Sequence, residues 1–182
     1  MDAPPIQYAR TSDGVNIAYW IMGHGEPLIH DMLPAASHLE LEWKLTSLRS
    51  WYERLFERFT VVRFDHRGRG LSDRDLSDLS LDAHMRDVDA VADAARLDTF
   101  VLLGTRHMGP VSIAYSVANP GRVSHLALLN TWASGAKPSV LTALEASRSL
   151  SKLDHGIWAE NIARFVAGRR DPDPALLDLF QG

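Results

Sequence analysis

Short apolar runs separated by turn residues fill the first part of the chain, a pattern typical of strands. Residues 6–10 and 16–20 are rich in β-branched and aromatic side chains, and the segment between them contains an Asp-Gly pair that favours a tight turn. We therefore predict an antiparallel hairpin. Further strands are predicted at 28–30 and at 59–64, where the second run ends at Asp65.

Helical periodicity separates these strands. Leucine and aromatic residues recur at three- and four-residue spacings through 39–58, which predicts one or two amphipathic helices, with Ser37 as the cap and Glu40 three residues later. A second helix is predicted over 81–97 and is capped by Ser80 or Ser77.

The chain is organised around an apolar run at 101–105 that breaks and restarts as a helix from about 109 to 118. Proline stops that helix at 120, and a buried strand is predicted at 123–130. This alternation predicts a parallel sheet with right-handed crossovers. From 134 onward the periodicity is helical only, over 140–153, 157–166 and 175–180.

Composition narrows the class of protein. A chain of 182 residues with 46% hydrophobic content predicts one sizeable core, and a formal charge of -4 gives no general attraction to nucleic acid or to an anionic membrane. There is no cysteine, so thiol chemistry is excluded. No leader pattern and no apolar run of about 20 residues occurs, so we expect a cytoplasmic protein without membrane contact.

Four motifs in order resemble those of one family: SDGVNIAY at 12–19, SHLELEW at 37–43, DHRGRGLSD at 65–73 and NPGRV at 119–123. The sequence resembles the α/β-hydrolases, specifically the branch found alone or fused to class III adenylate/guanylate cyclase domains. The resemblance implies an α/β fold, a mostly parallel sheet with helices on both faces. It further implies a truncated hydrolase core at 1–133 and a partial helical cap at 134–182.

In that family a strand–turn–helix carries the nucleophile in a Gly-x-Ser-x-Gly elbow. The register that aligns the flanks places Arg106 at the serine and Met108 at the second glycine. A guanidinium is always protonated and cannot attack an acyl carbon. Thr105 is the nearest hydroxyl but is one residue away from the apex. We therefore expect no intact catalytic residue, and a turn that has relaxed to avoid the cost of a positive φ and of Met108.

The resemblance also implies two oxyanion-hole amides, which map to Ala35 and His107, and an acid and a histidine later in the chain, which we expect to be missing from these 182 residues. If the two amides still converge, Arg106 beside them makes a relic site for a small carboxylate or phosphate. The competing arrangement has Arg106 pointing outward or paired with an acid such as Asp31.

Other polar features receive structural interpretations. The eight histidines show no metal-ligand spacing, so no metal and no cofactor is expected, and His66 is assigned to a loop. The loop 65–70 lacks the third glycine of a dinucleotide site and is interpreted as a structural turn. The charged stretch at 86–89 is interpreted as a solvated face, and the tryptophans at 43, 51 and 132 as core or pocket wall.

The sequence leaves two main candidate functions. The first is a hydrolase-like protein without hydrolase activity, which acts as a ligand-sensing, regulatory or association module. The alternative is an α/β-hydrolase acting on an ester or a related small substrate, with missing elements supplied by another chain; a decayed or truncated product without function is a third possibility. An open edge at 123–130 predicts a homo-oligomer.

Overall fold

The computed structural model describes residues 2–32, 37–76, 78–133, 149, 152–167 and 174–181. The chain divides into two compact units, Met1–Ala133 and Ser134–Gly182. The first unit contains all six strands of the sheet.

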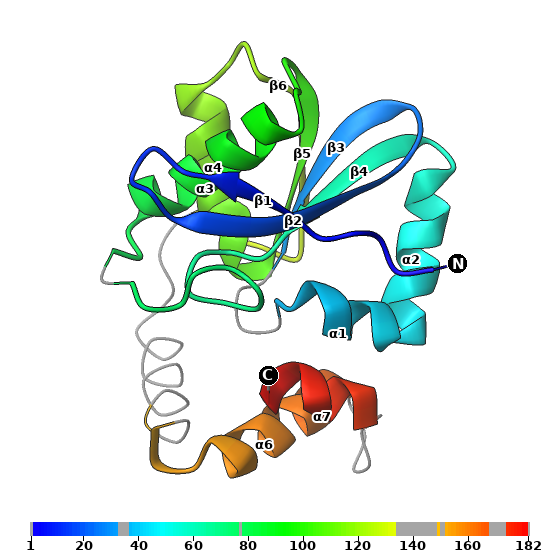
Figure 1. Ribbon diagram of the computed structural model, residues 1–182, viewed down its shortest axis with the longest axis vertical. Coiled ribbons are helices and arrows are strands. Elements are labelled where there is room, and N and C mark those ends of the chain that lie inside the picture. The colour runs from blue at the N-terminus through cyan, green and yellow to red at the C-terminus, as the bar shows by residue number, and fades with distance from the viewer. Residues whose placement is uncertain are drawn as a thin grey trace. The chain divides into compact units, whose positions relative to one another are not determined.

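Six strands form one sheet in the order β1-β2-β4-β3-β5-β6 (Figure 1). Their bounds are β1 Gln7–Arg10, β2 Asn16–Gly23, β3 Glu26–Asp31, β4 Phe59–Phe64, β5 Phe100–Thr105 and β6 Val123–Leu129. β1 and β2 form the expected antiparallel hairpin, and β2 joins β4 antiparallel. The strands β4, β3, β5 and β6 are mutually parallel, so the predicted mostly parallel sheet is confirmed.

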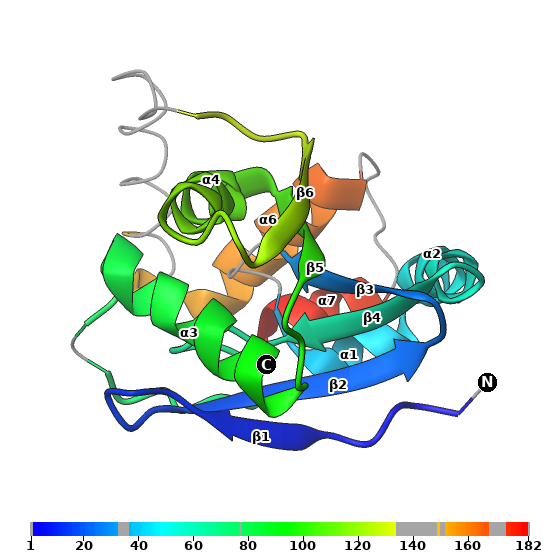
Figure 2. The same cartoon turned by 90° about the horizontal axis from the view of Figure 1, so that it is seen from above.

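Helices cover both faces of the sheet (Figure 2). One face carries α1 Leu39–Lys44 and α2 Thr46–Phe56, and the other carries α3 Leu81–Ala94 and α4 Gly109–Ala118. The periodic stretch 39–58 thus forms two helices, because Leu45 between them has the extended backbone angles φ -77 and ψ 107. The fold class expected from the sequence is confirmed.

Successive side chains of a strand point to opposite faces of the sheet, so each face has its own hydrophobic core. Ile17 and Tyr19 face α3 and α4, whereas Ala18 and Trp20 face α1 and α2. The core under α1 and α2 is aromatic: the ring of Trp20 makes edge contacts with those of Trp43, Tyr52 and Phe56. The interpretation of Trp43 as a core residue is therefore confirmed.

The cap of α1 differs from the prediction. His38, not Ser37, is the N-cap, and its side chain accepts a hydrogen bond from the amide of Leu41. The Ser37 hydroxyl instead donates to Asp65 Oδ1 at 2.7 Å, in the loop after β4. The hydroxyl of Ser37 therefore bonds to a residue that is distant in sequence and does not cap the helix. Ser80 caps α3 as predicted.

β6 occupies one edge of the sheet, and its side chains are mostly exposed. The expectation that this strand is buried is therefore wrong in the described structure. Leu126, Leu128 and Leu129 are among the exposed large hydrophobic residues. The strand presents apolar surface at its free edge.

In the second unit the structure describes α6 His155–Ala167 and α7 Pro174–Gln181, which confirm the helices expected over 157–166 and 175–180. Most of the helix expected at 140–153 lies outside the described residues. Within the part of the chain that is described, no helix combines the length and the apolar character that crossing a bilayer requires.

Candidate functional site

The parallel strands bring their carboxyl ends to one edge of the sheet, where the polar side chains of interest gather. The register pairs Asp31 at the end of β3 with Gly104 near the end of β5, and β4 leads directly into Asp65 and His66. A ligand site at the carboxyl edge of an open α/β sheet is the general expectation for this architecture.

The turn after β5 keeps the shape of a sharp strand-to-helix elbow. β5 ends at Thr105, a 3₁₀ turn, η2, spans Arg106–Met108, and α4 starts at Gly109. Arg106 has φ 52 and an exposed side chain. The relaxed turn expected from the sequence is therefore wrong, because a non-glycine residue holds the left-handed conformation at a cost of about 1–2 kcal/mol.

At each of the two glycines that flank this turn, a neighbouring side chain leaves no room for a Cβ atom. A Cβ at Gly104 would collide with Ser112 of α4, and a Cβ at Gly109 would collide with Thr131 after β6. Met108 has an ordinary φ of -88 and a buried side chain, so the steric conflict expected at this residue does not arise. The Thr131 hydroxyl also donates to the carbonyl of Arg106, which holds the apex in place.

Thr105 does not present its hydroxyl at the apex. The side chain is buried, 6% exposed, and Oγ1 donates to the main-chain carbonyl of Asp31 at 3.1 Å. This bond ties β5 to the end of β3. The geometry supports a structural role for the hydroxyl.

Asp31 is fully buried and occupied by partners other than Arg106. Its Oδ2 accepts a hydrogen bond from Ser112 Oγ at 2.9 Å, and its Oδ1 lies 2.6 Å from His66 Nε2. The pairing of Arg106 with Asp31 that the sequence left open is therefore not formed. The side chain of Arg106 is exposed, which matches the outward arrangement that the sequence left open as the alternative to a pocket charge.

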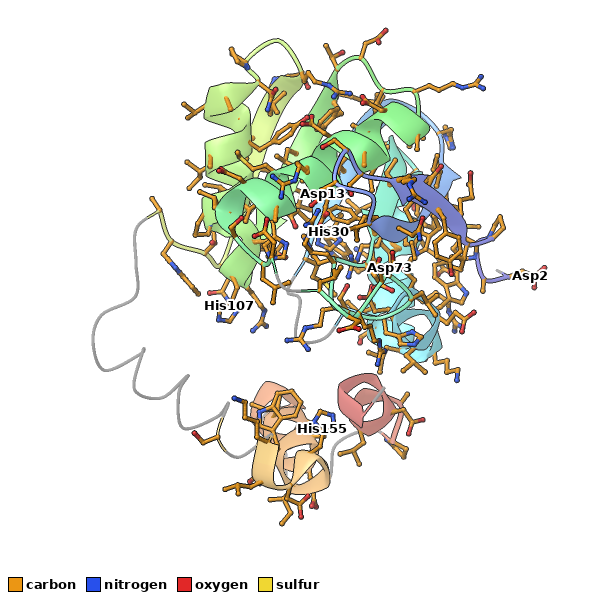
Figure 3. All side chains as sticks on the ribbon, turned by 60° about the vertical axis from the view of Figure 1, so that its left-hand side comes forward. Asp2, Asp13, His30, Asp73, His107 and His155 are labelled. Carbon is orange, nitrogen blue, oxygen red and sulfur yellow. The ribbon has the colours of Figure 1, made fainter. Side chains whose placement is uncertain are left out.

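His107 lies next to the apex at the rim of the first unit (Figure 3). Its ring makes an edge contact with that of Trp132, with centroids 5.1 Å apart. Partial burial lowers the pKa of His107, and the charge of Arg106 lowers it further. Both effects favour the neutral imidazole, and the fixed positive charge at the turn is that of Arg106. Ala35, the other residue assigned to the anion site, lies outside the described residues.

The loop after β4 is a structural turn, as predicted. Asp65 Oδ2 accepts from the amides of Leu39 and Leu71 at 3.2 and 2.9 Å, and Ser72 Oγ donates to the Asp65 carbonyl at 2.6 Å. Every one of these bonds joins the loop to itself or to α1. No phosphate-binding role is needed to explain its residues.

Arg67 binds carboxylates, which corrects the interpretation of the stretch 86–89 as solvated. Its Nε donates to Asp87 Oδ1 at 2.8 Å, and its Nη1 donates to Asp13 Oδ2 at 2.8 Å. Asp87 is fully buried on the inner side of α3. The hydrogen bond from Arg67 is the largest cause of the lowered pKa of Asp13.

A buried ion pair that the sequence pattern does not predict joins α1 to β4. Glu42 Oε1 lies 2.5 Å from Arg63 Nη2, and Tyr52 donates to Glu42 Oε2 at 3.3 Å. Burial raises the pKa of Glu42, while the charge of Arg63 opposes the rise. Burial also lowers the pKa of the neighbouring His30, with further contributions from Arg63 and His66. The available signal was helical spacing, because Glu42 lies three residues after Leu39 and next to Trp43, on the buried face of α1.

A second missed group joins the loop after β4 to α3. His66, His84 and Asp87 form the group of described residues that could hold a metal ion. No spacing in the sequence connects position 66 with positions 84 and 87, because they meet only through the fold.

Comparison with known proteins decides the family. A family model described as the alpha/beta hydrolase fold matches residues 24–172, well over half of the chain. The chain belongs to this family. Haloalkane dehalogenase 2 of Mycobacterium tuberculosis is 31% identical over 108 residues, which are 59% of this chain and 38% of that protein.

Solved structures support the fold. A hydrolase from Pseudomonas aeruginosa PA01 superimposes with a TM-score of 0.74 at 22% identity, covering 99% of this chain and 67% of that one. The esterase EaEST from Exiguobacterium antarcticum gives a TM-score of 0.76 at 18% identity, over 96% of this chain and 67% of the esterase. The chain spans between 30% and 40% of the length of the curated relatives that it matches.

Proposed function

We propose that this α/β-hydrolase-fold protein binds a small anion, a carboxylate or a phosphate, at the turn after β5 and does not hydrolyse esters. Arg106 is the observation that carries the proposal. It holds the apex of the turn at φ 52 with its side chain exposed. At this apex the elbow of α/β-hydrolases presents its nucleophile. A guanidinium cannot attack an acyl carbon, but its fork of N–H donors suits carboxylate and phosphate oxygens.

The neighbours of Arg106 support the same interpretation. Thr105 donates its hydroxyl to a backbone carbonyl inside the sheet, so it is not a substitute nucleophile. The pKa of His107 is lowered, so the fixed positive charge at the turn is that of Arg106. The proposal includes the amides of His107 and Ala35 as further donors to the anion. Sensing of the bound anion, as a regulatory or association module, fits the resemblance to domains fused to nucleotide cyclases.

A thermal-shift panel of acetate, benzoate, inorganic phosphate and a phosphate monoester tests the proposal. Binding at 100 times the Kd stabilises the folded state by about 2.7 kcal/mol, which for a chain of this size raises Tm by several degrees. Arg106→Ala should abolish the shift. Arg96→Ala is the matched control, since Arg96 is also an exposed arginine with positive φ, 56°, on another loop. Equal or negligible shifts in all three proteins would contradict the proposal.

The ester-hydrolase alternative draws on the names of the relatives, a hydrolase and an esterase among the solved structures. It requires a nucleophile that the turn does not present. We expect no p-nitrophenyl ester turnover above a heat-denatured control. Turnover that is lost in Thr105→Ala would favour the alternative and would assign the hydroxyl a catalytic role.

A further inference from the structure

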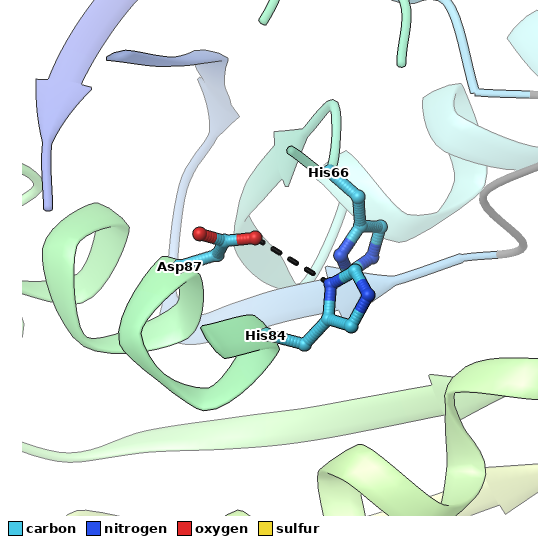
Figure 4. A group of neighbouring side chains, drawn as sticks. All are labelled: His66, His84 and Asp87. Carbon is cyan, nitrogen blue, oxygen red and sulfur yellow. Dashed lines mark ion pairs between the residues drawn. The ribbon is translucent and has the colours of Figure 1, made fainter. Parts of the chain in front are cut away.

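Two histidines and an aspartate from the loop after β4 and from α3 meet in one cluster (Figure 4). His66 comes from the loop itself. His84 and Asp87 lie three residues apart on α3, so both side chains project from one face of the helix. Their candidate ligand atoms lie within 4.8 Å of one another.

We propose that His66, His84 and Asp87 bind a divalent transition-metal ion of the zinc type. Two imidazole nitrogens and one carboxylate oxygen are a ligand set that zinc and non-haem iron accept, with the remaining positions taken by water or a small ligand. This site is separate from the anion site proposed at Arg106, and its test does not depend on that proposal.

Unpartnered polar atoms gather in this cluster. Six buried side-chain nitrogen and oxygen atoms of the described residues lack a hydrogen-bond partner, and four of them lie at or next to this cluster. Two of the four, His66 Nε2 and Asp31 Oδ1, face one another at 2.6 Å, which leaves Nδ1 of His66 and Nδ1 of His84 to be explained. Burying such atoms without partners costs about 1–3 kcal/mol each, so a concentration of them at one place needs an explanation. A bound cation gives the imidazole lone pairs a partner.

The separation of His84 from Asp87 also suits a shared ion. Nδ1 of His84 lies 3.6 Å from Oδ2 of Asp87, too far for a hydrogen bond. Two ligands on one tetrahedral zinc ion, each at about 2.0–2.2 Å, stand roughly 3.4 Å apart. The pair is thus already at the spacing that a common ion sets, and His66 needs a shift of about 1 Å or a little more to complete it.

Partners outside the cluster occupy the proposed ligand atoms weakly or not at all. Arg67 donates its Nε to Oδ1 of Asp87 at 2.8 Å, whereas Oδ2 accepts only the weaker bond from the Arg67 amide at 3.3 Å. Nε2 of His66 lies at ion-pair distance from Asp31, without the alignment of a hydrogen bond. Asp31 therefore orients the ring and leaves Nδ1 as the ligand atom, the arrangement of a carboxylate behind a metal-bound histidine.

Access to the site comes through His84. Its side chain is 15% exposed, whereas those of His66 and Asp87 are fully buried. An ion can therefore reach the cluster at the exposed part of His84 and displace the protons that compete for the two imidazoles.

Isothermal titration of the metal-free 182-residue protein with Zn²⁺ tests the proposal. Wild type should bind one equivalent, and His84→Ala should bind at least 10-fold more weakly with an unchanged circular dichroism spectrum. His84 is suited to this test because its partial exposure makes the variant less disruptive than His66→Ala. Asp31→Asn, which removes the orienting charge, should weaken binding by 10–100-fold.

His125→Ala is the matched control, since His125 is 76% exposed on β6 and should leave zinc affinity unchanged. Absence of stoichiometric binding to wild type would overturn the proposal. So would wild-type affinity in His84→Ala, or equal losses in His84→Ala and His125→Ala, because either result would place the bound zinc elsewhere on the surface.

Discussion

His66 Nε2 lies 2.6 Å from Asp31 Oδ1, and neither side chain is exposed to solvent. The other oxygen of Asp31 accepts a hydrogen bond from Ser112, one turn into α4. A single carboxylate at the end of β3 therefore links the loop after β4 to the helix that follows the elbow. The main chain of Asp31 is tied to β5 as well, because its carbonyl accepts a hydrogen bond from Thr105 Oγ1.

Replacing this carboxylate should be costly. Asp31→Asn keeps the size of the side chain and a partner for Ser112 but removes the charge that faces His66. Loss of a buried interaction with a charged group lowers the free energy of unfolding by about 1.5–3 kcal/mol. Urea unfolding at pH 7 measures the loss. Asp98→Asn, an exposed carboxylate after α3, is the control and should stay within about 0.5 kcal/mol of wild type. An Asp31→Asn protein as stable as wild type would show that the pair contributes nothing.

The backbone strain at Arg106 can be separated from the function of its side chain. Glycine adopts φ 52 without the Cβ penalty, so Arg106→Gly should be more stable than Arg106→Ala by about 1 kcal/mol. The same pair of variants at Arg96, where φ is 56, should show a similar difference. Chemical denaturation of the four variants measures both differences. If alanine and glycine are equivalent at 106 but not at 96, the apex does not hold a left-handed conformation in solution.

Acid should destabilise the protein through His30. Burial holds the pKa of His30 well below its ordinary value of 6.5, and Arg63 and His66 add to the effect. Between the lowered pKa and about 6.5 the unfolded chain binds a proton that the folded chain does not, so stability falls as pH decreases through this window. The slope contributed by one histidine reaches about 1.4 kcal/mol per pH unit.

Stability measured from pH 7 down to pH 5 in wild type and in His30→Asn tests this expectation. Asparagine retains a partner for the Tyr52 hydroxyl, which lies 3.3 Å from His30 Nδ1. The variant should have a shallower pH dependence, while His125→Asn on the exposed face of β6 should keep the wild-type slope. Parallel curves for wild type and His30→Asn would assign the acid sensitivity to other groups.

Self-association through β6 remains a prediction from the sequence. Edge strands pair with other chains, and the edge here carries Leu126, Leu128 and Leu129. We expect a homodimer or a larger assembly that pairs or buries this edge, and Leu128→Lys should shift sedimentation toward monomer at micromolar concentration. Leu153→Lys, an exposed leucine of the second unit, is the control. A wild-type protein that sediments only as monomer would contradict the expectation.

The fold followed from local patterns because each strand and helix carries its own period and its own turn residues. The hairpin, the strand ending at Asp65 and the helix capped by Ser80 depend on neighbours in sequence, and all three were predicted. The burial of Asp87 was not, because a charged residue in a helix is exposed unless a distant partner such as Arg67 compensates its charge. Sequence periodicity contains no information about that partner.

The candidate site, too, was predicted from the sequence only in part. Alignment of the flanks located Arg106 at the apex, since strand, turn and helix are consecutive. The conformation of the apex was mispredicted, because it depends on Thr131, 25 residues away, which bonds to the Arg106 carbonyl. The cluster of His66, His84 and Asp87 could not be predicted from the sequence, because its members come together only when α3 packs on the sheet.

The close contact between Gly109 and Thr131 affects which sequence patterns can detect chains that have this elbow. A pattern search that requires glycine two positions after the elbow residue passes over this sequence, since Met108 stands there and the crowded position is one residue later. Two glycines five positions apart, Gly104 and Gly109, enclose this turn. A search that asks for that spacing, with any residue at the apex, would collect proteins that share the elbow without sharing its chemistry.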